Sequence, residues 1–177
     1  MSLLHILSIS KEFAYKKEER YNINGVRIEL ASNNIKAIAT NGHMLSVFEC
    51  NNFDNINNIP SGEYTISLNS IKVIEKVLKA DKNADISKYI EKIQADFLEY
   101  EKVLTPCQDS AENRICSFNP DYLQIIGNTC SVFNKHFQNQ DKNDAMFFEY
   151  NGINKPAKFS INGKNCKFHG LIMPMKS

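Results

Sequence analysis

The chain has 177 residues, of which 42% are hydrophobic and 10% aromatic, and 21 basic residues against 20 acidic ones give a formal charge of +1. This length and composition predict one globular domain with a real core, or one domain with a substantial insertion, and exclude a disordered chain. The balanced charge argues against a dedicated high-affinity nucleic-acid binder, which normally carries a clear basic excess.

The cysteines are widely spaced and include no Cys-x-x-Cys pair. They are Cys50, Cys107, Cys116, Cys130 and Cys166. This set predicts reduced, mostly buried thiols rather than a disulfide framework or a zinc site. The first residues lack the basic and apolar regions of a signal peptide, and no apolar run approaches the ~20 residues of a membrane span. We therefore expect a soluble, cytoplasmic protein.

The N-terminal part predicts a helix followed by an antiparallel meander. Residues 3–19 carry apolar side chains at helical spacing, and three alternating segments after them predict strands. The strands are expected at 22–30, 35–40 and 44–48. Asn33-Asn34 and Asn41-Gly42 supply turn residues that tolerate positive φ.

The middle of the chain predicts a loop, a strand and two helices. The Asn-rich residues 51–61 indicate a loop, and residues 64–68 indicate a strand. Asn69 is a candidate cap for a helix that follows this strand. Residues 85–104 then show a second apolar pattern of helical spacing, which Thr105-Pro106 ends.

The C-terminal part predicts a strand, a helix and three further strands. Residues 114–118 indicate the first strand, and Asn119 with Pro120 marks the start of a helix that extends toward Phe137. The last strands are expected at 145–150, 157–161 and 167–173. Both ends of the chain thus follow the pattern of a helix and three strands, which indicates an internal duplication.

Two short segments far apart in the chain carry a family resemblance. Residues 39–45 read Ala-Thr-Asn-Gly-His-Met-Leu, and residues 173–176 read Met-Pro-Met-Lys. The first resembles the Ala-Thr-Asp-Gly-His-Arg-Leu turn of the bacterial DNA polymerase III beta subunit, the beta sliding clamp, and the second resembles the Met-Pro-Met-Arg that ends that polypeptide. Weaker similarities to the same family fall at 21–26, 64–78, 97–104 and 115–175.

The resemblance implies a DNA-clamp-like α+β fold of two helix-plus-sheet halves. A clamp polypeptide has three domains and is about twice as long as this chain, so we expect one clamp-like domain over 1–177. Its halves would be 1–50 and 110–177, with 51–109 as a partly helical insertion. Two incomplete domains are the alternative, but they would leave sheet edges unpaired.

In the family, the two segments meet and line a groove that binds peptide tails of polymerases and other partners. The resemblance therefore implies a peptide-binding site at Thr40, Gly42, His43, Met44, Leu45, Met173, Pro174 and Met175. Asn41 replaces the usual acid and Met44 the usual Arg, which makes the turn less polar and changes which peptides fit. The alternative is an ordinary strand turn and an apolar C-terminal segment without a binding role.

Clamps contact DNA through basic residues on the helices that face the hole of the ring. The resemblance implies this role for Lys11, Lys16, Lys17 and Arg20. Glu12, Glu18 and Glu19 are interleaved with these residues, so a solvated helix face is the alternative interpretation.

The sequence contains no catalytic constellation. The four histidines lack metal-ligand spacing, and no phosphate-binding Gly-rich loop or nucleophile elbow is present. We expect no enzyme activity and no cofactor or metal. The expected function is that of a DNA replication accessory, or processivity factor, which binds partner peptides and assembles into a ring on DNA. The alternative is a clamp-fold regulatory protein that binds a replication partner without encircling DNA.

Overall fold

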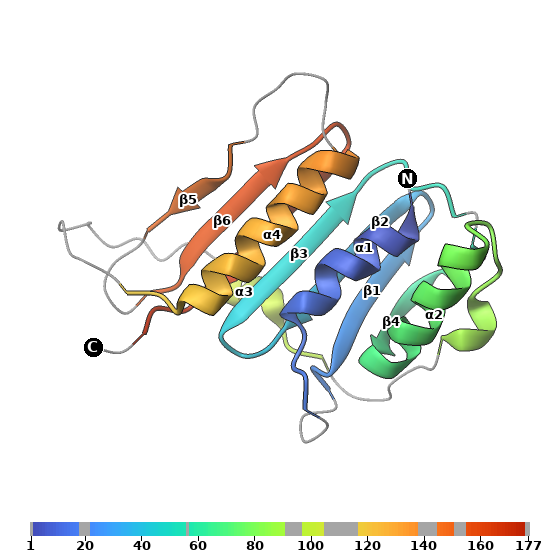
Figure 1. The fold of residues 1–177 in the computed structure, drawn as a ribbon, viewed down its shortest axis with the longest axis horizontal. Helices are drawn as coiled ribbons and strands as arrows, with labels where there is room; N and C mark the ends of the chain where they lie inside the picture. Colours follow the sequence, from blue (N-terminus) through green and yellow to red (C-terminus); the bar gives the residue numbers. More distant parts are fainter. Residues whose placement is uncertain are drawn as a thin grey trace.

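The computed structural model describes residues 2–17, 22–55, 57–90, 97–104, 117–137, 145–150 and 155–175. It contains a seven-stranded antiparallel sheet in the order β4-β1-β2-β3-β7-β6-β5 (Figure 1). The strands are β1 (Gly25–Ala31), β2 (Asn34–Thr40), β3 (Met44–Cys50), β4 (Gly62–Ser67), β5 (Phe147–Glu149), β6 (Ala157–Asn162) and β7 (Cys166–Ile172). The helices are α1 (Leu3–Ser10), α2 (Leu68–Ala80), α3 (Tyr100–Leu104) and α4 (Pro120–Phe137), with 3-10 turns η1 (Lys11–Phe13) and η3 (Ser87–Tyr89). The predicted α+β class is confirmed.

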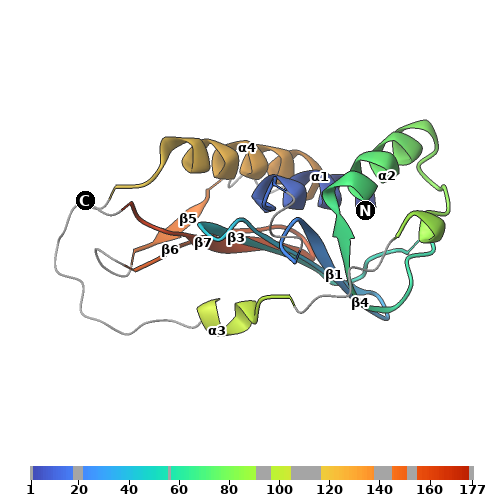
Figure 2. The same cartoon turned by 90° about the horizontal axis from the view of Figure 1, so that it is seen from below.

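Of the helices in the described residues, α1, α2 and α4 cover one face of the sheet and α3 lies on the other face. Figures 1 and 2 show α1, α2 and α4 side by side on one face and α3 across the sheet from them. The main core lies between the three-helix layer and the sheet, where fully buried aromatic rings contact one another. These rings belong to Phe13, Phe48, Phe133, Phe159 and Phe168. Each buried ring contributes about 1.5–3 kcal/mol to folding through the hydrophobic effect.

The sheet is close to symmetric about its centre. Strands β1, β2 and β3 follow α1, and strands β5, β6 and β7 follow α4, so two groups of one helix and three strands meet at the β3–β7 ladder. β4 extends the sheet beyond β1, and α2 packs against α1 in the same helical layer. Two similar halves therefore share one continuous sheet, and part of the 51–109 segment completes its layers. The division of the chain into a domain with an insertion stays a prediction.

The central ladder joins residues far apart in the chain. Its register runs from Met44 opposite Ile172 to Cys50 opposite Cys166. Gly170 permits this close pairing, because a Cβ atom there would overlap the carbonyl oxygen of Leu45.

The predicted N-terminal helix over 3–19 is wrong in its second half. Helical structure ends with η1 at Phe13, and Ala14 is extended, with φ −73° and ψ 152°. The backbone N–H of Tyr15 then donates to the carbonyl of Ile23 at 3.0 Å. The helix can end here because Phe13 and Ala14 are already buried in the core. The tertiary hydrogen bond then satisfies the Tyr15 N–H in place of a helical one.

The predicted continuous helix over 85–104 is also wrong. The described part of this segment contains only η3 and the short helix α3. Ile86 packs in the main core, whereas Phe97 and Tyr100 pack on the opposite face of the sheet with Ile38, Val47 and Leu171. The apolar side chains thus serve two faces of the sheet instead of one helix stripe.

Smaller differences concern caps and turns. The cap of α2 is Ser67 rather than Asn69, since the Ser67 hydroxyl accepts from the N–H of Ser70 at 3.1 Å. In the β1–β2 turn the positive φ falls on Ser32. The strand expected at 114–118 is not present at its described residues 117 and 118, and the rest of it lies outside the described residues. The predicted start of α4 is confirmed, with Asn119 Oδ1 accepting from the N–H of Asp121 at 2.9 Å.

Candidate functional site

The turn between β2 and β3 is closed by its own polar side chains. Asn41 Oδ1 accepts hydrogen bonds from the backbone N–H groups of His43 and Met44, both at 2.8 Å. The Thr40 hydroxyl accepts from the Gly42 N–H at 3.0 Å and donates to the Met44 carbonyl at 2.7 Å. Gly42 has φ +88°, which costs glycine little. These bonds hold the turn in one conformation.

The C-terminal motif lies directly beside this turn. The Met173 N–H donates to the His43 carbonyl at 2.8 Å, which extends the β3–β7 ladder by one pair. Two residues further on, the Met175 N–H donates to the carbonyl of Ser117 at 2.8 Å. The ladder therefore brings together two segments that are far apart in the sequence.

A small apolar cavity opens where the two segments meet, and we call it the motif cavity. It has a volume of about 80 Å³. Its lining residues are Thr40, Gly42, His43, Met44, Leu45, Leu98, Val103, Leu171 and Met173. Pro174 and Met175, which were also predicted for the site, do not line the cavity, and the side chain of Met175 is exposed.

Two lining residues come from the segment over 97–104, which the sequence pattern assigned to a single helix. Leu98 and Val103 are 46% and 43% exposed, so they present apolar surface at the mouth of the cavity. No sequence signal identified them. Apolar residues at helical spacing do not indicate on which face of the sheet their segment packs. The resemblance of 97–104 to the stretch that joins two clamp domains was the nearest indication.

The methionines contribute unequally. Met44 is 2% exposed and packs in the main core, whereas Met173 is 40% exposed. Met173 is therefore the methionine that gives the cavity an exposed, flexible and polarisable side chain.

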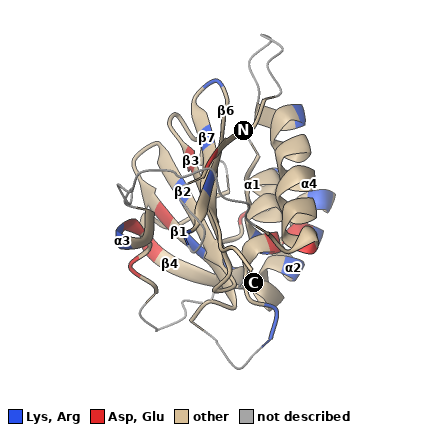
Figure 3. Cartoon of the chain, turned by 90° about the vertical axis from the view of Figure 1, so that its left-hand side faces the viewer, with Lys and Arg blue, Asp and Glu red and all other residues tan. Residues whose placement is uncertain are grey.

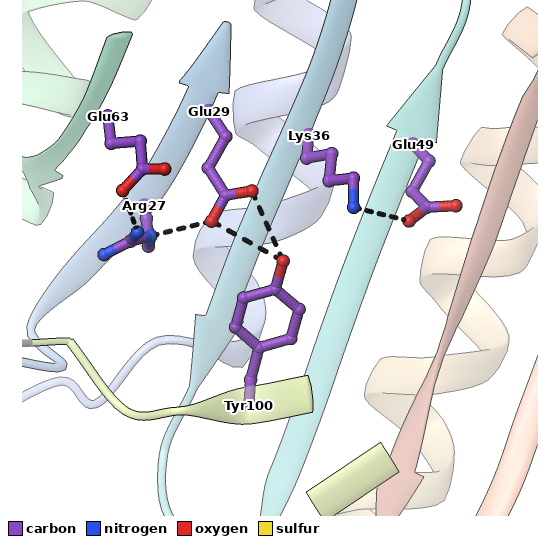
Figure 4. A network of polar contacts seen from close by, with 6 residues as sticks. All are labelled: Arg27, Glu29, Lys36, Glu49, Glu63 and Tyr100. Atoms are coloured by element: carbon purple, nitrogen blue, oxygen red, sulfur yellow. Dashed lines mark hydrogen bonds and ion pairs between the residues drawn. The ribbon is translucent and has the colours of Figure 1, made fainter. Parts of the chain in front are cut away.

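A polar network holds the 97–104 segment against the sheet (Figure 4). The Tyr100 hydroxyl donates to the Glu29 carboxylate at 3.3 Å, and Glu29 also pairs with Arg27 at 2.9 Å. The Arg27 guanidinium lies 5.7 Å from the centre of the Phe97 ring, within cation–π range. Burial, followed by the charge of Glu29, raises the pKa of Tyr100 above its usual range, so this phenol stays protonated and remains a donor.

Neighbouring charges on the same face also form pairs. Lys36 and Glu49 are 3.4 Å apart, and His169 approaches Glu49 at 3.9 Å. His169, followed by Lys36, lowers the pKa of Glu49 to about 2. This carboxylate therefore stays ionised at neutral pH.

Solved structures that superpose on this chain include bacterial sliding clamps. The DNA polymerase sliding clamp from Pseudomonas aeruginosa superposes with a TM-score of 0.70 at 13% identity, covering 100% of this chain and 66% of that one. The chain has the fold of the sliding clamps. The DnaN sliding clamp (DNA polymerase III subunit beta) from Bartonella birtlesii bound to griselimycin gives 0.66 at 15% identity, covering 99% and 64%. The beta subunit from Thermotoga maritima gives 0.65 at 14% identity, covering 99% and 63%.

This clamp-like chain thus spans slightly less than two thirds of the length of those sliding clamps. No protein-family model and no curated protein matches its sequence. The described part of the chain contains no helix long and apolar enough to cross a membrane. Among the same residues, no three His, Cys, Asp or Glu side chains are grouped to hold a metal ion.

The basic residues predicted to contact DNA occupy different environments in this clamp fold. Lys11 pairs with the buried Glu75 at 2.6 Å, so its charge compensates that carboxylate. Lys16 and Lys17 are exposed but follow the last helical turn, with Lys16 lying 3.6 Å from Glu12. Arg20 lies outside the described residues.

A second set of basic residues lies on the helical layer and was not predicted. Figure 3 shows basic positions (blue) on α2 within the helical layer. The exposed lysines of α2 recur every three or four residues and so share one face of the helix. They are Lys72, Lys76 and Lys79. The sequence signal was present as a one-sided lysine stripe on an amphipathic helix.

Proposed function

We propose that this protein is a non-enzymatic accessory of DNA replication that binds an apolar peptide tail of a replication partner in the motif cavity. The observation that carries the proposal is the cavity itself, which forms where the Gly-His turn and the Met-Pro-Met segment meet. A small concave apolar site with few polar groups is typical of a docking point for a peptide anchor.

The cavity suits one aliphatic or aromatic anchor side chain. Its volume of about 80 Å³ exceeds the ~15 Å³ that a cavity needs to hold one water molecule. Leu98, Val103 and Met173 surround the mouth with exposed apolar surface that a bound peptide would cover. Binding would then be driven by burial of this rim, at roughly 25 cal/mol for each Å² removed from water.

The proposal is tested by peptide binding to a variant of the rim. A fluorescein-labelled C-terminal tail of a bacterial replicative polymerase serves as the probe in an anisotropy titration. Val103→Glu places a charge at the mouth of the cavity, and we expect its Kd to rise about tenfold or more.

Val73→Glu is the matched control. Val73 is 45% exposed, as Val103 is 43% exposed, but it lies on α2 across the sheet. The control should bind like the wild type. Binding at this cavity is contradicted if the wild type and both variants bind the peptide with equal affinity. It is also contradicted if both variants lose affinity for the peptide.

We further propose that copies of the chain assemble through their sheet edges into a ring on DNA. In the described part of the chain β4 pairs only with β1 and β5 pairs only with β6, so both edges offer free backbone groups. Phe147 and Phe148 on β5 are 59% and 43% exposed, which supports contact with a second copy.

The helical layer is the proposed DNA-facing side of such a ring. Lys16 and Lys17 remain candidates for phosphate contact, together with Lys72, Lys76 and Lys79 of α2. Lys11 is the weakest candidate because its ammonium group is already paired with Glu75. The competing proposal keeps the peptide site but has no ring, as in a regulatory protein that binds a replication partner without encircling DNA.

A further inference from the structure

Two cysteines face each other across the central ladder. Cys50 is the last residue of β3, and Cys166, the first residue of β7, is its register partner. Just beyond them the Asn51 N–H donates to the Asn165 carbonyl at 2.9 Å, which makes Asn51 and Asn165 a hydrogen-bonded pair. Pairs alternate along an antiparallel ladder, so Cys50 and Cys166 form a non-hydrogen-bonded pair.

This kind of pair has the geometry of a disulfide. Cα atoms in a non-hydrogen-bonded pair are about 4.5 Å apart, within the ~4.4–6.8 Å range that disulfides span. Both side chains point toward the main core, where they are 2% and 8% exposed. Neither sulfur is part of a disulfide in this structure.

The two thiols are chemically unequal. The Cys166 thiol donates a hydrogen bond to the sulfur of Cys50, which lowers the pKa of Cys50 despite its burial. The same hydrogen bond, together with burial, raises the pKa of Cys166. Cys50 is thus the more acidic thiol of the pair, and its Sγ–H donates to the Asn51 carbonyl at 3.1 Å. The thiolate is the reactive form of cysteine.

We propose that Cys50 and Cys166 are an oxidation site that forms a cross-strand disulfide with a low-molecular-weight disulfide, such as oxidised glutathione, as the oxidant. The Cys50 thiolate attacks one sulfur of the oxidant and releases one glutathione thiol, which leaves a mixed disulfide on Cys50. Cys166 then attacks the Cys50 sulfur and releases the second glutathione thiol. Two protein thiols are oxidised, one small disulfide is reduced, and the two protein protons are left on the two released glutathiones.

The bond would secure the ladder that builds the motif cavity. Met44 and Ile172 pair at the cavity end of β3 and β7, and the cysteines pair at the opposite end. A covalent link there prevents separation of the two strands and fixes their register. Oxidation would thus stabilise the arrangement on which the cavity depends, independently of what occupies it.

The test is refolding of the full chain in a buffer of reduced and oxidised glutathione, so that burial in the native state does not block the oxidant. Free thiols are then alkylated, and the protein is digested and measured by mass spectrometry. We expect the peptides that contain Cys50 and Cys166 to be linked, with the mass of the whole chain lower by two hydrogens. The oxidised form should melt roughly 5 °C or more above the reduced form.

Cys50→Ala and Cys166→Ala should each abolish the link and the rise in Tm. Cys130→Ala is the matched control, because Cys130 lies on α4 beside Met146, with 3.2 Å between the sulfur atoms, and should keep both effects. Alkylated Cys50 and Cys166 in correctly refolded wild-type protein, or a link from either of them to Cys107 or Cys116 instead, would overturn the proposal. Circular dichroism of every sample separates these results from a failure to fold.

Discussion

At the scale of single residues, the Gly-His turn depends on the Asn41 side chain. Its Oδ1 accepts the N–H groups of His43 and Met44, so one amide oxygen satisfies two backbone donors. The clamp turn that this segment resembles carries an acid at this position, and Asn can take its place because the two N–H groups need only an acceptor. Asn41 therefore keeps a hydrogen-bond acceptor at this position of the turn.

We expect Asn41→Ala to destabilise the protein by about 1–3 kcal/mol, because two backbone donors lose their acceptor. Asn41→Asp keeps the acceptor and should stay within about 1 kcal/mol of the wild type. Urea unfolding followed by circular dichroism measures both values. Equal losses in the two variants would show that the amide N–H₂ group, not the oxygen, matters.

At the scale of elements, the sequence predicted the helices and strands whose residue pattern has a single physical cause. Strand β6 alternates between buried and less buried residues because it has two faces, and Asn119-Pro120 starts α4 because both residues suit a helix N-terminus. The 85–104 segment could not be predicted in this way. Its apolar spacing is helical, but Ile86 and Tyr100 pack on opposite faces of the sheet, which only tertiary structure determines.

The candidate site was predictable to a similar extent. The resemblance identified six of the lining residues, and the β3–β7 register explains why two distant segments meet. Leu98 and Val103 were missed, because their contribution depends on how the 97–104 segment crosses the sheet, and Leu171 was missed because it lies on β7 outside both motifs.

We expect Phe97→Ala to release that segment locally. Phe97 is 8% exposed, and truncating a buried phenylalanine costs about 3–5 kcal/mol in a core, or less at a small satellite cluster such as this one. Hydrogen exchange should accelerate about tenfold or more at the amides of 98–104 and remain unchanged in α4 of the same sample. Uniform acceleration in both regions would indicate global destabilisation instead of a locally attached segment.

At the scale of the whole molecule, the open sheet edges determine whether the chain acts alone or in an assembly. If copies associate through β5, light scattering should give a mass that rises with concentration. Phe147→Lys should reduce that mass to the monomer value, because a charge on an edge strand opposes pairing. Leu123→Lys, on the exposed side of α4, is the control and should assemble normally. A wild-type monomer at every concentration would contradict the ring and favour the regulatory function.

The β3–β7 ladder also has a consequence for how the chain folds during synthesis. β3 belongs to the first fifty residues, but its partner β7 begins only at Cys166. Until β7 leaves the ribosome, β3 is the edge of a half-built sheet, and its side chains, nearly all buried in the final fold, remain uncovered. The nascent chain is thus exposed to aggregation until β7 is made, and the pairing of β7 with β3 completes both the centre of the sheet and the motif cavity at the same moment.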